Sequence, residues 1–497
     1  MNTAIRPTGP RTFDPLAWLA GVTILFSIAR GFYPGWGSPL WFDETYTATI
    51  ATQKSFGGLI DWCLHELSGP VYYTLTWVWT QLFGASAAAL RMPSLLCAIV
   101  TPLLIIWKGG AARNVRIIWA ALLLLWLPGV TFPSEARPYA LLMLLTTGQV
   151  ILFHQLLTHG GLRRAIGGAV LTAAIILTHY HALIISALQG LLYLALRRQE
   201  IRTTWPAALT FVPVAVWIYF HLPFVLAYTS PGVAGNDLLS PADVLRIPTS
   251  LVGGNIVAAL FMLAMMGSML VDATRLMRGR DGHWFTAVEL ATVAASLAGA
   301  LIVIAIGFAK PTFVMRYLTP FMPGIFFGLA VWTCAVARRF ALLPAALVIA
   351  TLFGAASDFA SRVRHPELDV RYRFNFEQAS AWLRTRGIRR LVFFWDNTTA
   401  TISSGARLGE VGSYFLRQDG WRGPVIVPRL AGINVDPNIA LGAIATTSGD
   451  GIIWAYDRLY AGSLGRHTPP RLAAMRDAFD CRNYGLQNYV VMTCIRR

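Results

Sequence analysis

A series of apolar segments separated by short polar loops constrains this chain more than any other feature of its sequence. About 20 apolar residues form a helix that crosses the hydrocarbon core of a bilayer. A composition of 55% hydrophobic and only 13% charged residues is typical of a protein built from such helices. The sequence therefore predicts a polytopic α-helical membrane protein with about eleven transmembrane helices. The segments are 14–32, 87–107, 117–133, 138–155, 165–180, 182–197, 206–226, 249–271, 286–308, 318–336 and 340–357.

The distribution of arginine and lysine predicts the orientation of these segments. If the N-terminus is cytoplasmic, every inner loop contains at least two positive residues, as the positive-inside rule requires. An odd number of spans then places residues 358–497 on the outer side. Topology also explains the net charge of +17, and since no basic stripe or nucleic-acid motif is present, we expect no nucleic-acid partner. The inner-loop cations are Lys108, Arg113, Arg116, Arg163, Arg164, Arg197, Arg198, Arg202, Arg275, Arg278, Arg280, Arg338 and Arg339.

The chain changes character at about residue 358, where turn residues and short apolar stretches replace the long apolar segments. A helical pattern ends at Gly387, and residues 390–395 follow as a buried strand. This order predicts a small α/β domain over 358–497, after a membrane module over 1–357 whose first outer loop spans 33–86. Further strands are expected at 424–428, 451–456 and 488–495.

Cys481 and Cys494 are thirteen positions apart in this C-terminal region. Outside the cytoplasm they could form a disulfide, because oxidising compartments allow it. The sequence leaves the paired and the unpaired state open.

Charges of both signs collect on the predicted outer face of the membrane module. One interpretation is a set of solvated loops and structural ion pairs. The other, which we favour, is a polar site that handles an anionic, lipid-linked substrate. The cations are Arg30, Lys54, Arg91, Arg137, Arg246, Lys310 and Arg316, and the acids are Asp43, Glu44, Asp61, Glu66, Glu135, Asp237 and Asp243.

Asp43 and Glu44 are adjacent carboxylates just after the first apolar segment. Carboxylates at a bilayer surface are costly unless they have a role, and Asp43 is the best candidate for a general base. The alternative is that one of the two acids only caps a helix over residues 45–50.

Two further outer loops contain candidate residues. Glu135 and Arg137 lie between prolines, where they form either a charged turn or a second acid with a phosphate-binding arginine. Lys310 and Arg316 precede Tyr317 at the edge of a span, where they either anchor the helix by snorkelling or neutralise a departing phosphate.

His179 and His181 do not share a helical face, and no carboxylate is near them in sequence. A polar contact in the outer cavity or an interfacial anchor is the favoured interpretation, and a metal site is not expected. No zinc pattern, glycine-rich phosphate loop, nucleophile elbow or dinucleotide fingerprint is present, so a nucleotide-sugar donor is unsupported.

An ordered set of motifs resembles a known superfamily. The Asp-Glu pair is followed by Gly-Pro-Val-Tyr-Tyr (69–73), Ala-Leu-Arg-Met-Pro-Ser-Leu-Leu (89–96), Ser-Glu-Ala-Arg-Pro-Tyr-Ala (134–140) and Arg-Tyr-Leu-Thr-Pro-Phe-Met-Pro (316–323). This order is similar to that of the GT-C superfamily, in particular bacterial family-39-like proteins related to protein mannosyltransferases and aminoarabinose transferases.

The resemblance implies an inverting glycosyltransferase that uses a polyprenyl-phosphate monosaccharide at the periplasmic face of a bacterial inner membrane. The acceptor would be lipid A, the lipopolysaccharide core or another envelope glycan. A protein O-mannosyltransferase-like enzyme is one alternative. The other is a transporter, although charges gathered at one surface and the lack of a repeat disfavour it.

The resemblance also implies residue roles. Asp43 would deprotonate the acceptor with support from Glu44, and Glu135 matches the second-loop acid. Relatives of this branch need no catalytic metal, so we expect no cofactor. In many relatives a His-Pro-Pro-Leu-Tyr-Tyr motif occupies the first loop, whereas here His65 is displaced upstream. The implied substrate-binding residues are Arg137, Lys310, Arg316, Tyr317, His65 and Arg91.

Overall fold

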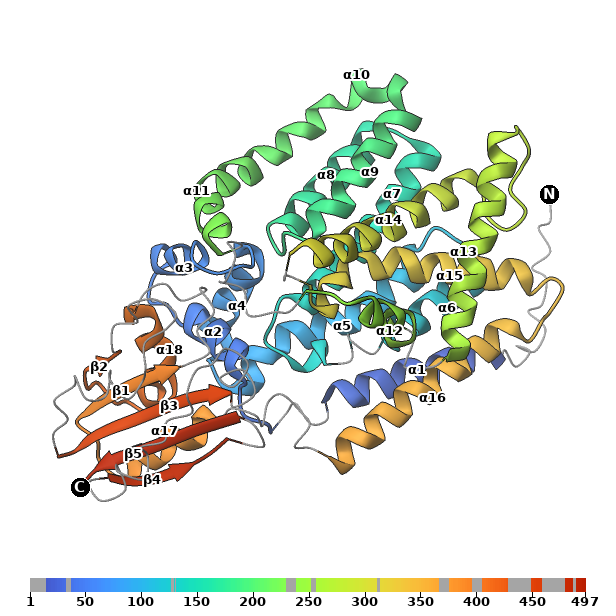
Figure 1. The fold of residues 1–497 in the computed structure, drawn as a ribbon. Helices are drawn as coiled ribbons and strands as arrows, with labels where there is room; N and C mark the ends of the chain where they lie inside the picture. The colour runs from blue at the N-terminus through green and yellow to red at the C-terminus, as the bar shows by residue number, and fades with distance from the viewer. Residues whose placement is uncertain are drawn as a thin grey trace, which may run out of the picture.

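The computed structural model of this chain contains a bundle of long helices and a smaller α/β part, joined through three short helices (Figure 1). The residues that the structure describes are 15–32, 37–126, 129, 131–228, 238–251, 256–310, 313–365, 375–395, 405–427, 448–457, 479–485 and 489–497.

The helical bundle contains a helix at each predicted apolar segment. The predicted segment 249–271 covers the end of a separate short helix, α12 (Pro241–Leu251), and most of the next long helix, which continues to Met277. The long helices are α1 (Pro15–Phe32), α5 (Ala87–Lys108), α6 (Arg113–Leu124), α7 (Tyr139–His159), α8 (Leu162–Ile176), α9 (Ala182–Leu196), α11 (Val212–Tyr228), α13 (Ile256–Met277), α14 (Ala287–Ala309), α15 (Met322–Val336) and α16 (Leu343–Arg364). Shorter pieces are α10 (Ile201–Thr204), η1 (Phe132–Ser134), η2 (Arg198–Glu200), η3 (Trp205–Phe211) and η4 (Met315–Phe321).

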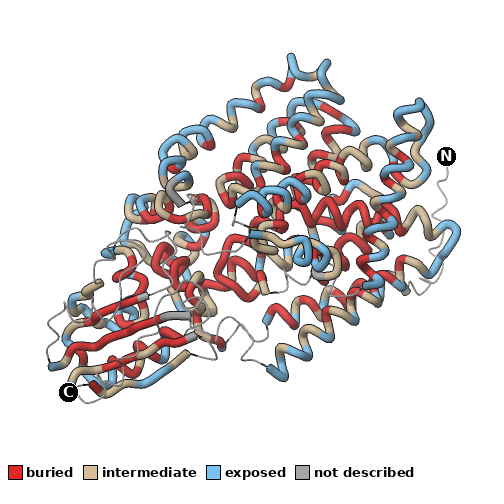
Figure 2. Tube along the Cα trace, in the orientation of Figure 1, coloured by how far each residue is buried: buried red, intermediate tan, exposed pale blue. Residues whose placement is uncertain are grey.

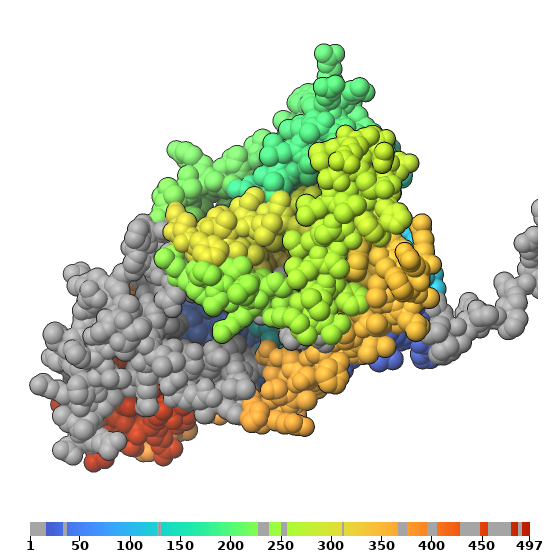
Figure 3. Space-filling view, turned by 45° about the vertical axis from the view of Figure 1, so that its right-hand side comes forward, coloured from blue at the N-terminus to red at the C-terminus, as the bar shows by residue number. Residues whose placement is uncertain are grey.

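Seven helical segments in the described ranges are long and apolar enough to cross a membrane, and two shorter apolar helices accompany them. The polytopic membrane character is thereby confirmed, while the count of eleven spans stays a prediction. Large side chains such as Leu25, Tyr219 and Phe353 point outward, as expected where lipid replaces water. Buried residues concentrate between the helices (Figure 2). Helices α12, α13 and α16 form part of the molecular surface that is seen in Figure 3.

The first outer loop folds into three helices that lie between the bundle and the C-terminal sheet (Figure 1). These are α2 (Phe42–Ala51), α3 (Phe56–Cys63) and α4 (Pro70–Phe83). Ser55 caps α3 by accepting a bond from the amide of Gly58 at 3.1 Å. Pro70 begins α4, where its missing N–H costs nothing.

The C-terminal part is the expected α/β domain. Among its described residues, five strands form one sheet in the order β2-β1-β3-β5-β4, with β1 parallel to β2 and β3, and β5 antiparallel to β3 and β4. Cys481 and Cys494 face each other across β4 and β5 and form a disulfide. The elements are α17 (Phe376–Thr385), β1 (Arg390–Trp395), α18 (Gly405–Gln418), β2 (Val425–Ile426), β3 (Asp450–Asp457), β4 (Phe479–Asn483) and β5 (Tyr489–Arg496).

Helix α18 connects this sheet to the outer-loop helices. A Cβ at Gly412 would lie 2.3 Å from the Phe393 ring, so only glycine allows α18 to pack this closely on β1. On the other side of α18, Glu410 accepts a bond from Trp62 Nε1 at 2.9 Å, and Arg407 pairs with Asp61 at 2.9 Å. The sheet domain therefore rests on the helices that follow Asp43.

Candidate active site

The two adjacent acids of α2 point to different surroundings. Trp41 is in the extended region and α2 starts at Phe42, so Glu44 is the third residue of the helix. The backbone amide of Trp41 donates to Glu44 Oε2 at 3.1 Å, which caps the helix. The sequence left open that one of the two acids caps a helix, and in the structure Glu44 does so.

Glu44 also forms a fully buried ion pair with Arg91 of α5. Arg91 Nε and Nη2 lie 2.7 and 2.6 Å from the two carboxylate oxygens, and the amide of Ala136 donates to Glu44 Oε1 at 2.8 Å. The remaining donors of Arg91 bind the carbonyl oxygens of Ser38 and Pro39, each at 2.9 Å. With side chains 0% and 1% exposed, this pair connects α2, α5 and the loop before α7 and has no face open to a substrate.

Asp43 lies in a second cluster, which is open to solvent. Its Oδ2 atom is 3.4 Å from Arg316 Nη1 and 3.7 Å from Arg137 Nη2, and its side chain is 24% exposed. Arg137 also donates to the Asp43 carbonyl at 3.3 Å and to the Tyr73 hydroxyl at 3.4 Å. Three separate segments of the chain thus meet at one accessible carboxylate.

Glu66 is a buried member of the same cluster. Its Oε1 atom lies 3.7 Å from Arg137 Nη2. Burial raises the pKa of Glu66, and the charge of Arg137 offsets only part of this shift. Arg137 thus lies between two carboxyl groups, one accessible and one buried.

Aromatic and histidine side chains form one wall beside Arg316. The His181 ring stacks on Tyr317 with centroids 4.1 Å apart, His179 lies 5.5 Å from Tyr317, and Arg316 lies over Tyr139 at 5.6 Å. Burial lowers the pKa of His181 to about 4, so this ring is neutral at physiological pH. Such flat, neutral rings offer a surface on which a sugar or prenyl group can pack.

The overall arrangement matches known structures. No protein-family model and no curated protein sequence matches this chain. Two crystal structures of ArnT from Cupriavidus metallidurans do match, one in the apo state and one bound to undecaprenyl phosphate. The TM-scores are 0.59 and 0.56 at 11% and 12% identity, over 97% of this chain and 98% of ArnT.

The chain has the fold of ArnT. The fold that the sequence resemblance implied, a bundle of membrane helices followed by a C-terminal sheet domain, is thereby confirmed. At this identity the likeness establishes the fold, and the roles of residues depend on the geometry of the site.

Within this ArnT-like fold, some of the residues proposed from sequence lie away from the Asp43 cluster. Lys310 is exposed at the end of α14 and forms no ion pair within the described residues. His65 Nδ1 lies 2.8 Å from the Asp61 carbonyl oxygen, and its ring contacts Phe224 of α11. Glu135 is buried in the loop that binds Glu44.

The sequence interpretation missed several members of the cluster. Tyr73 belongs to the Gly-Pro-Val-Tyr-Tyr motif and Glu66 is one of the outer acids, but the sequence pattern assigns neither to the site. For His181 the sequence allows either a contact in the outer cavity or an interfacial anchor. No spacing signal links Glu66 to Tyr73, because Glu66 precedes the helix that begins at Pro70. Across the described ranges, no three His, Cys, Asp or Glu side chains are placed to hold a metal ion.

Proposed function

We propose that this protein is an inverting glycosyltransferase that moves a monosaccharide from a polyprenyl-phosphate donor to an acceptor of the bacterial cell envelope. The observation that carries the proposal is one accessible carboxylate, Asp43, held 3.4 to 3.7 Å from two arginines at the end of a membrane bundle. The ArnT fold supports it, since one ArnT structure contains undecaprenyl phosphate.

The chemistry needs a base on one side of the sugar and positive charge on the other. Asp43 accepts the proton of the acceptor hydroxyl while the oxygen of that hydroxyl attacks the anomeric carbon of the donor sugar. The bond from that carbon to the phosphate oxygen breaks, and the electron pair leaves with the polyprenyl phosphate. Because attack and departure occur on opposite faces, the configuration inverts.

Arg137 and Arg316 are suited to the departing phosphate. A guanidinium presents a planar fork of donors that matches phosphate oxygens. Within the described residues, Arg137 Nε and Arg316 Nε have no hydrogen-bond partner although they are buried. Both side chains therefore have unused donor capacity beside Asp43, which an incoming phosphate satisfies.

Glu44 and Arg91 are positioning residues in this proposal. They hold the start of α2 against the loop that carries Arg137, through the amide of Ala136. Glu135 belongs to that same loop, and we assign it a role in shaping the loop. Lys310 and His65, which lie away from the Asp43 cluster, contact an acceptor or a lipid headgroup as it approaches the site.

The site faces the periplasm in this proposal. Positive loops at the opposite ends of the helices support that orientation. The disulfide between Cys481 and Cys494 also fits an oxidising compartment. The acceptor is then lipid A, the lipopolysaccharide core or another envelope glycan.

Mass spectrometry of envelope lipids and glycans tests the proposal. Wild type, a deletion strain, and strains carrying Asp43→Asn or the exposed Asp281→Asn are compared. We expect one sugar substituent to be missing from the deletion and from Asp43→Asn, and present with Asp281→Asn. Identical glycans in all four strains would remove the enzymatic assignment.

A second measurement addresses cofactors. The proposed mechanism uses no metal, so transfer by purified protein should continue after treatment with a strong chelator. Loss of transfer that returns on adding a divalent cation would contradict the metal-free mechanism while leaving the transferase assignment intact.

A further inference from the structure

Arg30, near the end of α1, is a buried cation whose charge is only partly compensated. The side chain is 4% exposed, and Nη2 donates to the Leu124 carbonyl at 3.3 Å. Within the described part of the chain, Nε and Nη1 have no hydrogen-bond partner. Asp358 of α16, whose charge acts on Arg30, forms its own ion pair with Arg362 at 2.9 Å. Two arginines thus share one carboxylate.

Such an arrangement is costly without a further partner. Moving a cation out of water is unfavourable unless an anion and hydrogen bonds replace the lost hydration. Arginines inside membrane bundles accordingly mark sites where an anionic group or water binds. The two unused donors of Arg30 are what a phosphate oxygen accepts from.

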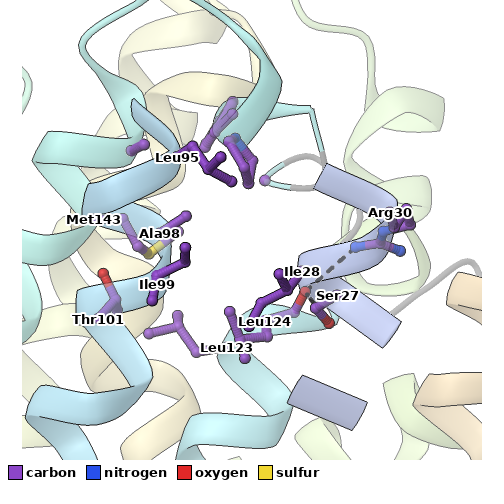
Figure 4. A pocket seen from close by; sticks show the side chains of 14 residues that line it. Ser27, Ile28, Arg30, Leu95, Ala98, Ile99, Thr101, Leu123, Leu124 and Met143 are labelled. Atoms are coloured by element: carbon purple, nitrogen blue, oxygen red, sulfur yellow. Dashed lines mark hydrogen bonds between the residues drawn. The ribbon is translucent and has the colours of Figure 1, made fainter. Parts of the chain in front are cut away.

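A cavity of about 50 Å³ lies directly beside Arg30 (Figure 4). One water needs roughly 10–15 Å³ of such volume, so the cavity has room for about four oxygen-sized groups, as in a phosphate. Arg30 and Ser27 lie at one end, and Met143 and Thr101 lie at the other. Between them the lining is apolar: Ile28, Leu95, Ala98, Ile99, Leu123 and Leu124.

We propose that this cavity binds the phosphate group of a membrane lipid, with Arg30 as its main ligand. Arg30 is the third residue from the end of α1, which is the level at which lipid phosphates meet a membrane helix. The cavity itself holds the phosphate, and its apolar lining disfavours a small hydrated anion.

This site is separate from the Asp43 cluster. Pro133 lines the cavity, and a Cβ on Gly31 would be 3.0 Å from the Pro133 ring. Arg137, four residues further along, lies 3.7 Å from Asp43, and neither residue lines the cavity. A lipid in the cavity therefore packs against the loop that carries Arg137. The inference does not depend on the proposed transferase activity, because it concerns binding alone.

Native mass spectrometry of the delipidated full-length protein tests the site with phosphatidylglycerol as the probe. We expect Arg30→Gln to bind it roughly tenfold more weakly than wild type, since a charge-assisted contact is lost. Arg30→Lys should bind at an intermediate level. The matched control is Arg246→Gln, which removes an exposed arginine from α12 and should bind like wild type.

A second variant keeps the test decisive if Arg30→Gln folds poorly. Ala98→Leu fills the cavity and keeps Arg30, so it should also lose the bound lipid. Diacylglycerol, which lacks the phosphate, should bind equally to all variants. Equal phosphatidylglycerol binding by wild type, Arg30→Gln and Ala98→Leu would overturn the proposal. Displacement of the lipid by millimolar inorganic phosphate would overturn its lipid part, because the site would then accept the free anion.

Discussion

Asp43 and Glu44 are neighbours in sequence, yet the two regions that they enter differ in almost every physical respect. The Glu44–Arg91 pair is closed, with every guanidinium nitrogen of Arg91 bound and side chains 0% and 1% exposed. The Asp43 cluster has longer contacts of 3.4 to 3.7 Å and a partly exposed carboxylate. Short contacts between fully hydrogen-bonded groups stabilise a fold. Longer contacts, between groups with unused donors, leave room for a substrate.

The helix geometry explains how one dipeptide serves both regions. Consecutive residues of an α-helix point about 100° apart, so two adjacent carboxylates cannot share one environment. Glu44, at the third position, reaches back to the Trp41 amide, while Asp43 points to Arg137 and Arg316. The comparison therefore predicts that Asp43 affects turnover and that Glu44 affects folding.

The largest expected effect is on catalysis by Asp43→Asn. Loss of a general base typically lowers turnover by about 10²–10⁴-fold. Because the side chain is partly exposed and its contacts are long, the melting temperature should change little. Transfer by purified protein and thermal unfolding in detergent measure the two quantities, with Asp281→Asn as the matched control. Unchanged turnover together with a large loss of stability would reverse the assignment of the two acids.

The second-largest expected effect is a loss of folding stability in Arg91→Met. Removing one partner of a buried ion pair leaves an uncompensated charge and costs about 3–5 kcal/mol. We expect a loss of this size in the free energy of unfolding in mixed micelles, and the double variant Glu44→Gln/Arg91→Met should recover part of it. Arg246→Met, at an exposed arginine, is the control. A stable Arg91→Met with reduced substrate affinity would place Arg91 in the binding site.

The sequence allowed the layout of the bundle to be predicted because apolar length and loop charge are local properties. It also indicated Asp43, Arg137, Arg316 and Tyr317, which lie together in the structure. It could not identify the partner of Glu44, since Arg91 is 47 positions away and the contact arises only when α5 packs beside α2. Arg91 is part of a motif that resembles the superfamily, but the motif does not show that this arginine is buried.

The roles of Glu66 and His181 were missed for a related reason. Their importance comes from burial, which a single sequence does not show for loop residues. Glu66 acquires its raised pKa only when the first loop folds over it, and His181 becomes a stacking surface only when η4 brings Tyr317 to it. The α/β domain, in contrast, was predictable from a short helix followed by an apolar strand.

Glu66 offers a third, pH-dependent test of the comparison. Its pKa in the folded protein is raised above the unfolded value, so its contribution to stability is complete at pH below that unfolded value. The contribution is lost as pH rises through the folded pKa, at about 1.4 kcal/mol per pH unit. The stability of wild type relative to Glu66→Gln should therefore fall as pH rises from about 4. Unfolding measured from pH 4 to 8 checks this, and a difference that is constant with pH would show that the pKa is not raised.

The smallest expected effect concerns the contact between the C-terminal domain and the outer-loop helices. Glu410 of α18 accepts bonds from Trp62 at 2.9 Å and from Gln53 at 3.3 Å. Glu410→Ala should cost about 1 kcal/mol, as expected for hydrogen bonds at a partly exposed site. Limited proteolysis of the C-terminal domain should become faster, while turnover should change at most a few-fold.

Asp419→Ala is the matched control, since Asp419 pairs with Arg384 inside the same domain. If Glu410→Ala lowered turnover as strongly as Asp43→Asn, the division between a stabilising region and a reactive region would fail. The docking surface of α18 would then belong to the active site, because α2 and α3 would depend on it to present Asp43. A small effect on turnover with faster proteolysis keeps the two regions separate and leaves α18 as a support for the loop.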